Sequence, residues 1–492
     1  MKLSKSLYTR AIQCQKSLWL KKHNKDVLTP PNAAAQAIFE NGNEVGDLAC
    51  KLFPNGIEIP YLNTTFQDKI NLTQKYIEDG YENIYEATFE FDGILIMIDI
   101  LNINHNNVII NEVKSSTQVK DIYLHDASIQ YYVLNGLGYD VKKVNIIHIN
   151  NQYVRDEELD INQLFSIVDV TYEVKELQAN IKNNLEIFRK TLAKEDEPNI
   201  DIGTHCNEPY ECDAKEYCWS HIPNYSIFDI SRLKSQKKFE LYRNGILEFS
   251  QIKDINSFSQ SQQIQIKSEL ENKTIINKEA IKEFVNTLTY PIYHLDFETF
   301  QQAIPEFKGV SPYSQIPFQY SLHIEHEDGR LEHKEFLSLD GVDPREEIAR
   351  RLVEDIPNDV TVLAYNMGFE KGVIRKLANL FEQYSHGLMA IHDNCKDLMI
   401  PFQNKDYYHP NMKGSYSIKY VLPSLVPEFE NAYKELDLIH NGGEAMEAFA
   451  NLSKIDDEAL KQRYRDSLLE YCKLDTLAMV KILEKLKESL DE

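Results

Sequence analysis

Two apolar, β-branched runs that carry acidic residues lie far apart in the sequence, at 84–116 and 290–300. Each run predicts the start of a sheet, and helical patterns follow both. A chain of 492 residues is also too long for one ordinary core. We therefore expect an α/β multidomain protein, with a first domain at 1–225 and a second at 286–492.

The residues between these domains, 226–285, are polar and mostly helical, and they predict a helical linker region. Their Gln/Ser-rich run, 257–269, has the composition of a linker or of an exposed helix.

Composition and charge bound the compartment and the partners. No apolar run reaches membrane-spanning length and the first residues lack a signal-peptide core, so we expect a cytoplasmic protein without a membrane partner. A reducing compartment makes the seven cysteines ligands or buried thiols rather than disulfides. The net charge of −24 argues against a passive nucleic-acid coat. It allows a nuclease that offsets phosphate repulsion with divalent cations.

A hairpin with acidic residues is predicted from about 94 to 114, closing at the turn-forming sequence NHNN. Asp99 lies on its first strand, and hairpin closure places it close across the ladder from Glu112. Glu112 and Lys114 are two apart and share a face of the second strand. Carboxylates that hold Mg²⁺ or Mn²⁺, with a lysine that steadies transition-state charge, suit phosphodiester hydrolysis. The alternative is a solvated hairpin whose acidic pattern is incidental.

A second acidic set lies in the last 200 residues or so. The sequence LDFET places Asp296 and Glu298 on one face of an apolar strand. Glu370 begins a helix after the strand VTVLAY, while Tyr471 and Asp475 share one face of the last helix. The four carboxylates suit a two-metal site, with Tyr471 orienting the attacking water. The alternative is a degenerate nuclease fold kept for binding.

Three cysteines follow at an even six-residue step in HCNEPYECDAKEYC, namely Cys206, Cys212 and Cys218. A cysteine-ligated metal site usually needs four ligands, so a fourth must come from elsewhere. Zinc sites usually have more closely spaced cysteine pairs, but thiolate softness alone does not separate zinc from iron–sulfur. The residues by themselves therefore allow either a zinc ion or an iron–sulfur cluster.

The sequence EVKSS between apolar strands, followed by a helix with Gln130, resembles the PD-(D/E)xK nuclease core of the RecB family, which has a restriction-endonuclease-like fold. CRISPR-associated RecB-like nucleases and AddB-type nuclease domains carry one cysteine near the N-terminus and three after the core, and these bind a [4Fe–4S] cluster. Here Cys14 lies in the matching helix, LYTRAIQCQKSLWLKK. The resemblance implies a cluster on Cys14 and the three later cysteines. It also implies catalytic roles for Asp99, Glu112 and Lys114, and a substrate contact for Gln130.

Two features depart from the RecB pattern. Where that family often has a metal-binding histidine this chain has Gly46, and Glu40 and Glu44 are candidate substitutes. Two tyrosines follow Gln130 too early for the family's Gln-x-x-x-Tyr pattern. Glu86 is an additional acid that either faces the same cleft or is a surface strand residue.

Three later motifs resemble the tyrosine variant of the DEDD exonucleases, a ribonuclease H-like family that includes ribonuclease D and proofreading domains. D-x-E, AYN-x-x-FE and Y-x-x-x-D occur in the family's order. Glu370 replaces the usual aspartate. Lys419, in a segment like the family's Ser-Leu-Lys region, is either a phosphate contact or an ordinary exposed lysine. Asp397 sits where related chains often have an aspartate, but we do not expect it to be a ligand.

Together the halves resemble a bacterial family that fuses a RecB-like, cluster-bearing domain to a DEDD-type domain. This implies an Mg²⁺- or Mn²⁺-dependent nuclease with two centres that cuts single-stranded or frayed DNA and trims 3′ ends. Candidate roles are DNA repair and anti-phage defence, with partner proteins from those systems. The 28 Tyr and 22 Phe could stack on unpaired bases or fill cores. The alternatives are an RNA-trimming exoribonuclease with a vestigial first domain and a non-catalytic nucleic-acid adaptor.

Overall fold

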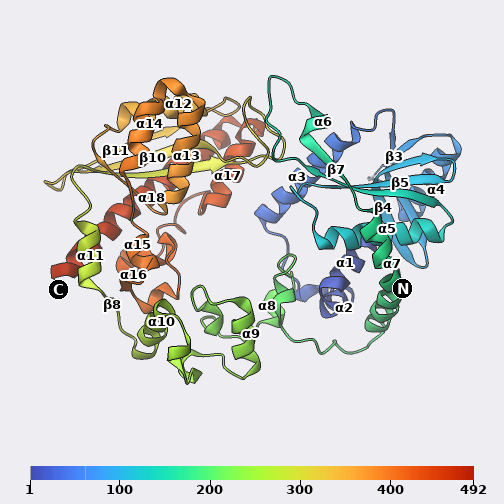
Figure 1. Ribbon diagram of the computed structural model, residues 1–492, viewed down its shortest axis with the longest axis horizontal. Helices are drawn as coiled ribbons and strands as arrows, with labels where there is room; N and C mark the ends of the chain where they lie inside the picture. The colour runs from blue at the N-terminus through green and yellow to red at the C-terminus, as the bar shows by residue number, and fades with distance from the viewer. Residues whose placement is uncertain (1, 61, 492) are drawn as a thin grey trace. The chain divides into compact units, whose positions relative to one another are not determined.

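The computed structural model describes residues 2–60 and 62–491. It divides into two compact units, each of which combines helices with a sheet (Figure 1). The first unit comprises Met1–His221 and Gln302–Ser314, and the second comprises Ile222–Gln301 and Gln315–Glu492. The chain is therefore an α/β multidomain protein with mixed sheets.

The sheet of the first unit has seven strands in the order β2-β3-β4-β5-β6-β7, with β1 paired to β4. β4 and β5 form the predicted hairpin, which turns at His105 and Asn106. β6 runs parallel to β5, so the chain crosses over through a helix between them. The strands are β1 (Leu3–Ser4), β2 (Ile57–Glu58), β3 (Asn83–Phe91), β4 (Ile94–Asn104), β5 (Asn107–Lys114), β6 (Asp140–Ile149) and β7 (Phe165–Asp169).

That crossover helix is α5 (Asp121–Gly136), which packs against the sheet and against α7 (Thr171–Leu192). It starts at Asp121 and carries both Asp126 and Gln130. An apolar core joins α5, α7 and α1 (Lys5–Gln13) to the sheet. The other helices of this unit are α2 (Gln15–His23), α3 (Ala33–Cys50), α4 (Phe66–Glu78), α6 (Ile161–Leu164) and α8 (Lys215–Cys218).

The segment Gln302–Ser314 leaves the second sheet and packs within the first unit. The Tyr313 hydroxyl donates to the Ser115 carbonyl, just after β5, and the Arg155 guanidinium donates to the Pro305 carbonyl at 2.7 Å. No local sequence pattern indicated this exchange.

The second unit contains a five-stranded sheet in the order β11-β10-β9-β12-β13. β9, β10 and β11 form an antiparallel meander, and β12 is parallel to both β9 and β13. The strands are β9 (Ile292–Phe300), β10 (Ile316–Glu325), β11 (Leu331–Leu337), β12 (Thr361–Ala364) and β13 (Cys395–Asp397), with a separate pair β8 (Ile275–Ile276) and β14 (Tyr407–Tyr408).

A 34-residue helix, α18 (Glu458–Asp491), lies along β9 and β10 and buries one face against them. The remaining helices are α9 (Ser235–Arg243), α10 (Gln260–Glu271), α11 (Lys278–Val285), α12 (Arg345–Asp355), α13 (Met367–Leu380), α14 (Glu382–Asn394), α15 (Ile400–Gln403), α16 (Ile418–Leu425) and α17 (Gly442–Asn451). None of the helices in the described part of the chain has the length and apolar character needed to cross a bilayer.

The Gln/Ser-rich run expected to be a linker or an exposed helix forms α10, and one face of that helix is buried. Gln265 is fully buried because its side-chain amide accepts from the Ser231 N–H at 2.9 Å and donates to the Tyr225 hydroxyl at 3.0 Å. Ile266 joins a small apolar cluster with the loops before the helix. Glutamine was a misleading signal here, since a satisfied amide can be buried.

Candidate metal centres

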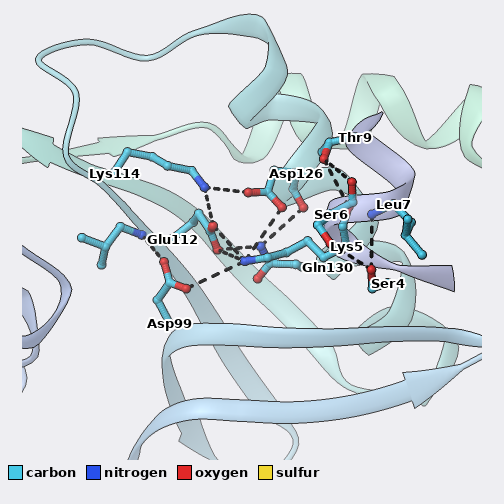
Figure 2. Close-up of polar contacts among 11 residues, drawn as sticks. Ser4, Lys5, Ser6, Leu7, Thr9, Asp99, Glu112, Lys114, Asp126 and Gln130 are labelled. Atoms are coloured by element: carbon cyan, nitrogen blue, oxygen red, sulfur yellow. Dashed lines mark hydrogen bonds and ion pairs between the residues drawn. The ribbon is translucent and has the colours of Figure 1, made fainter. Parts of the chain in front are cut away.

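The β4–β5 hairpin brings together the acids and the lysine predicted from its sequence. The Val113 N–H donates to Asp99 Oδ2 at 2.7 Å, which fixes Asp99 beside the second strand. Glu112 is buried and accepts from Lys114 Nζ at 2.6 Å and from Gln130 Nε2 at 2.7 Å (Figure 2). β4, β5 and α5 therefore place these four predicted side chains in one cluster, which we call the hairpin centre.

Two further members of the hairpin centre were missed in the sequence, Lys5 and Asp126. Lys5, at the start of α1, places Nζ 2.9 Å from Glu112 Oε1, and Asp126 Oδ2 accepts from Lys114 at 2.6 Å. Asp126 lies four residues before Gln130, so helical spacing alone could have placed both on one face. Lys5 offered no such signal, because it enters the cluster from more than 90 residues upstream of Asp99.

Burial raises the pKa values of two acids of the hairpin centre, whereas the nearby lysines lower that of the third, Glu112. Burial raises the pKa of Asp99 to about 7, and repulsion from Glu112 adds to this shift. Burial would raise the pKa of Glu112 as well, but attraction to Lys114 and Lys5 outweighs it and lowers that pKa. Burial and repulsion from Glu112 raise the pKa of Asp126. The two lysines thus neutralise Glu112 first and leave its neighbours less readily ionised.

The candidate substitutes for the missing histidine are placed differently from Glu86. Glu40 and Glu44 lie exposed on α3, as part of the same helix as Gly46. Glu86 interrupts the β3–β4 register with φ of 58°, beside the position of Asp99. Burial raises the pKa of Glu86, which also responds to Lys5 and Glu112. Glu86 therefore belongs to the electrostatic surroundings of the hairpin centre.

The tyrosines that follow Gln130 do not complete the family pattern. The Tyr132 hydroxyl donates to Asp92 Oδ2 at 3.0 Å, on an exposed turn, and Tyr131 packs against the apolar core. The ring that does reach the centre is Tyr123, with Lys114 Nζ 5.3 Å from its centroid.

The four cysteines that were expected to bind one metal group all line the same cavity in the first unit. We call them the cysteine site: Cys14, Cys206, Cys212 and Cys218. Cys14 lies between α1 and α2, and the later segment is held against α1. Arg10 makes two 2.7 Å hydrogen bonds to Asp213, and Gln13 Nε2 donates to the His205 carbonyl at 2.9 Å. Residues almost 200 apart in sequence are thereby joined.

Burial raises the pKa of the Cys218 thiol to about 11, and the nearby thiols add to this shift. Four thiols that line one cavity could hold either a zinc ion or an iron–sulfur cluster, because both groups take cysteine ligands.

The other cysteines lie elsewhere. Cys50 is partly buried on α3 and Cys395 is buried on β13. Cys472, on α18, is buried with its sulfur 3.8 Å from Asp296 Oδ2.

In the second unit, carboxylate oxygens of Asp296, Glu298 and Asp475 all lie within 4.8 Å of one another. β9 supplies the first two from one strand face, and α18 supplies the third together with Tyr471. The Tyr433 hydroxyl donates to Asp475 Oδ1 at 2.6 Å. We call this group the β9 centre.

Glu370 lies in the first turn of α13, outside the group of three carboxylates that lie within 4.8 Å of one another. It is 2% exposed, and its Oε2 has no hydrogen-bond partner among the described residues. Burial raises the pKa of Glu370 well above its usual value, and the charge of Asp296 raises it further. A buried carboxylate oxygen without a donor is a candidate ligand for a cation.

Burial is the main influence on every acid of the β9 centre. It raises the pKa values of Asp296 and Glu298 well above their usual range, with mutual repulsion as the next cause. It raises the pKa of Asp475 to about 6, although Tyr433 and Lys419 oppose that shift. Acids in this state resist ionisation unless a cation joins them.

Lys419 and Tyr471 line a cavity of about 180 Å³ with the acids of the β9 centre. Lys419 Nζ lies 5.6 Å from the centroid of the Tyr471 ring and donates to the His440 carbonyl at 3.2 Å. Asp397 has another role, since its Oδ1 accepts the N–H groups of Asn366 and Met399 at 2.9 Å. Tyr433 lies in an irregular loop, so no helical or strand spacing could have placed it at this centre.

Three comparisons with known proteins each found a partial similarity. Residues 293–417 match a family described as a domain of unknown function, DUF2779. An uncharacterized protein of Ureaplasma parvum serovar 3, UU173, is 25% identical over 242 residues, which cover 45% of this chain and 34% of that protein. The chain thus spans about a third of the curated relative it matches. A solved structure titled "Crystal structure of SSO0001" covers 45% of this chain and 86% of its own, with 11% identity and a TM-score of 0.23.

Proposed function

We propose that this protein is a metal-dependent nuclease with two centres, and that DNA is its substrate. The observation that carries this proposal is the convergence of Asp296, Glu298 and Asp475 in a buried cavity. Such carboxylates repel one another, and a pair of divalent cations is the natural partner for them. Cations held there would neutralise phosphate charge and activate a water for in-line attack.

The chain's own residues have distinct tasks in this proposal. Asp296, Glu298, Glu370 and Asp475 would hold the cations. Tyr471, whose ring lines the cavity, would orient the attacking water. The Lys419 ammonium, at the edge of the same cavity, would contact a substrate phosphate.

Several features support the DEDD-type, ribonuclease H-like assignment of the second unit. The antiparallel meander of β9, β10 and β11 continues into the parallel strands β12 and β13, as that fold requires. The acids lie on the central strand, on the helix after β12 and on the last helix. Tyr365 and Ile418 also line the cavity beside these acids, and their apolar and aromatic surface suits the end of an unpaired strand.

The hairpin centre supports a RecB-like PD-(D/E)xK assignment of the first unit. Asp99 and Glu112 would hold a cation, Lys114 would stabilise transition-state charge, and Gln130 would help to position Glu112 or the substrate. The cysteine site would hold a [4Fe–4S] cluster on Cys14 and the three later cysteines, which line one cavity of this unit. Such a cluster would join α1 to the segment before α8.

The test is cleavage of end-labelled single-stranded DNA and RNA with Mg²⁺, Mn²⁺ or EDTA. The wild type, Asp99→Asn, Asp296→Asn and the double variant are compared, with the exposed Asp359→Asn as a matched control. We expect metal-dependent DNA cleavage that each single variant reduces and the double variant removes. Cleavage of RNA alone, unaffected by Asp99→Asn, would indicate an exoribonuclease with a vestigial first domain. Binding without any cleavage would indicate an adaptor.

A further inference from the structure

Lys5 occupies a position in the hairpin centre that no other described cation shares. Its Nζ lies 2.9 Å and 3.0 Å from the two oxygens of Glu112, 3.8 Å from Asp99 Oδ1 and 3.9 Å from Asp126 Oδ1 (Figure 2). Three carboxylates on β4, β5 and α5 therefore converge on a single ammonium. The ammonium marks the point where a cation is best stabilised by this cluster.

We propose that Lys5 is a built-in counter-ion of the hairpin centre, whose ammonium holds the cation position and is displaced when a divalent cation binds. This inference rests on the proposed metal-binding function of Asp99 and Glu112. It adds an exchange between a side chain and a metal, which the sequence motif does not contain.

Lys114 is placed for a different task. Its Nζ pairs with Glu112 and Asp126 at 2.6 Å each and lies beside the ring of Tyr123. It therefore sits on one flank of the carboxylates, whereas Lys5 lies between them. A cation that took ligands from both Asp99 and Glu112 would meet the ammonium of Lys5 first.

The charge balance of the centre also favours an exchange. The three carboxylates around Lys5 carry up to three negative charges, and Lys5 and Lys114 carry two positive ones. Glu86, which also interacts with Lys5, can add a fourth negative charge. A divalent cation bound beside both ammonium groups would still place like charges within a few ångström of one another, and release of one ammonium would remove that repulsion.

The side chain of Lys5 is free to leave without unfolding its helix. It is 21% exposed, and lysine carries its charge on a flexible four-carbon stem. The backbone at this point is fixed independently, because Ser4 caps α1 by accepting the Leu7 N–H at 3.3 Å. The ammonium can therefore move to solvent while α1 stays in place.

The experiment measures Mn²⁺ binding by electron paramagnetic resonance in the full chain, with Asp296→Asn and Glu298→Gln present to disable the β9 centre. We expect Lys5→Met to bind Mn²⁺ about tenfold more tightly or better. It removes a positive charge that lies 3.8 Å from the carboxylate of Asp99, a proposed ligand of the cation. Lys5→Arg keeps the charge and should bind within about twofold of Lys5. Lys2→Met is the matched control, because Lys2 is exposed and pairs with Glu90 instead of with the hairpin centre.

Melting provides a readout that does not depend on activity. In EDTA, Lys5→Met should melt lower than the parent because Glu112 loses an ion pair, and saturating Mn²⁺ should raise its melting temperature more than the parent's. If Lys5→Met does not fold, Lys5→Gln carries the same expectations and keeps a donor for Glu112.

Equal or weaker Mn²⁺ binding by the neutral variant would overturn the inference while leaving the hairpin metal site intact. Absence of Mn²⁺ binding by both the parent and the neutral variant would overturn the proposed metal function of the hairpin centre, and the inference with it. The two failures are thus distinguished by the parent protein alone.

Discussion

The hairpin centre and the β9 centre are built from the same kinds of acid but are neutralised in different ways. In the hairpin centre, Glu112 already receives two ammonium groups and the Gln130 amide, and its pKa is lowered. In the β9 centre, the nearby ammonium is that of Lys419, which also donates to a carbonyl, and the pKa values of Asp296 and Glu298 are raised.

This difference teaches that a motif of acids does not by itself fix how a site responds to metal. In the hairpin centre, the negative charge of the acids is already balanced by lysine ammonium groups, so a metal ion must compete with a lysine side chain. The β9 centre stores repulsion that protons or cations must relieve. We therefore expect metal to stabilise the β9 centre more strongly than the hairpin centre.

The largest expected effect is on trimming by the β9 centre. Asp296→Ala should lower stepwise removal of 3′ nucleotides by about a thousandfold or more, because it deletes a ligand on the central strand. Gel assays on labelled single strands measure this, with Asp359→Ala as the exposed control. Unchanged trimming would show that the acids of β9 are structural.

The next effect separates the two centres. Lys114→Ala, made where Asp296→Ala has disabled the other site, should lower the remaining cleavage by roughly a hundredfold or more while leaving the fold intact. The loss follows from removing a charge beside Glu112 and Asp126. Lys142→Ala, exposed on β6, should retain activity. If Lys114→Ala and Lys142→Ala cleave equally well, Lys114 has no role in cleavage and the hairpin is structural.

The cysteine site concerns the first unit alone. If the group is an iron–sulfur cluster, protein purified without oxygen should be brown and contain iron rather than stoichiometric zinc. Cys14→Ala should lower the stability of the first unit, by roughly 10 °C in melting temperature, because the join between α1 and the later cysteines is lost. Cys50→Ala, outside the site, should have little effect.

Hydrogen exchange measured segment by segment would show which unit Cys14→Ala destabilises. Faster exchange should be confined to the first unit, with β9 to β13 unchanged. Uniform destabilisation of both units would contradict an isolated role for the cysteine site, and stoichiometric zinc without iron would contradict the cluster.

A smaller effect concerns pH in metal-free protein. Burial raises the pKa of Asp475 to about 6, well above its value in an unfolded chain. The folded state then holds its proton longer, so stability falls as pH rises from about 4 to about 6 and stays lower above that range. Asp475→Asn should remove this loss and raise the melting temperature in EDTA at pH 7 by a few degrees.

The same substitution should also abolish stabilisation of the second unit by Mn²⁺, since the amide is a poor substitute for a charged ligand. A difference in melting temperature between the wild type and Asp475→Asn in EDTA that stays constant from pH 4 to pH 6 would contradict the raised pKa of Asp475. Asp359→Asn, an exposed acid of the same unit, should show the wild-type dependence.

Some residues of the two centres could be predicted from the sequence and others could not. Two-residue strand spacing and four-residue helix spacing placed Asp296 with Glu298 and Tyr471 with Asp475, because local periodicity fixes the face of an element. Lys5 and Tyr433 could not be found in this way. Both reach their centres through the packing of distant segments, and no local periodicity marks a single lysine or tyrosine as part of such a centre.

The same reasoning explains the errors in the middle of the chain. The run 257–269 looks like a linker by composition, but Gln265 is buried because the backbone of another loop satisfies its amide. The return of Gln302–Ser314 to the first unit likewise depends on tertiary hydrogen bonds made by Tyr313 and Arg155. The composition of a segment predicts only its average exposure, and specific tertiary contacts of this kind can bury residues that composition would place at the surface.

The smallest expected effect tests how the β9 centre treats water. Tyr471→Phe should slow trimming about tenfold without changing the metal requirement, because it removes a hydroxyl that orients water but leaves every carboxylate in place. Tyr433→Phe is the informative partner, since its hydroxyl donates to Asp475 Oδ1 at 2.6 Å. Losing that donor should change the Mn²⁺ concentration needed for half-maximal rate more than the rate at saturation. If instead Tyr471→Phe alters the metal requirement and Tyr433→Phe alters only the saturated rate, the roles assigned to the two hydroxyls must be exchanged.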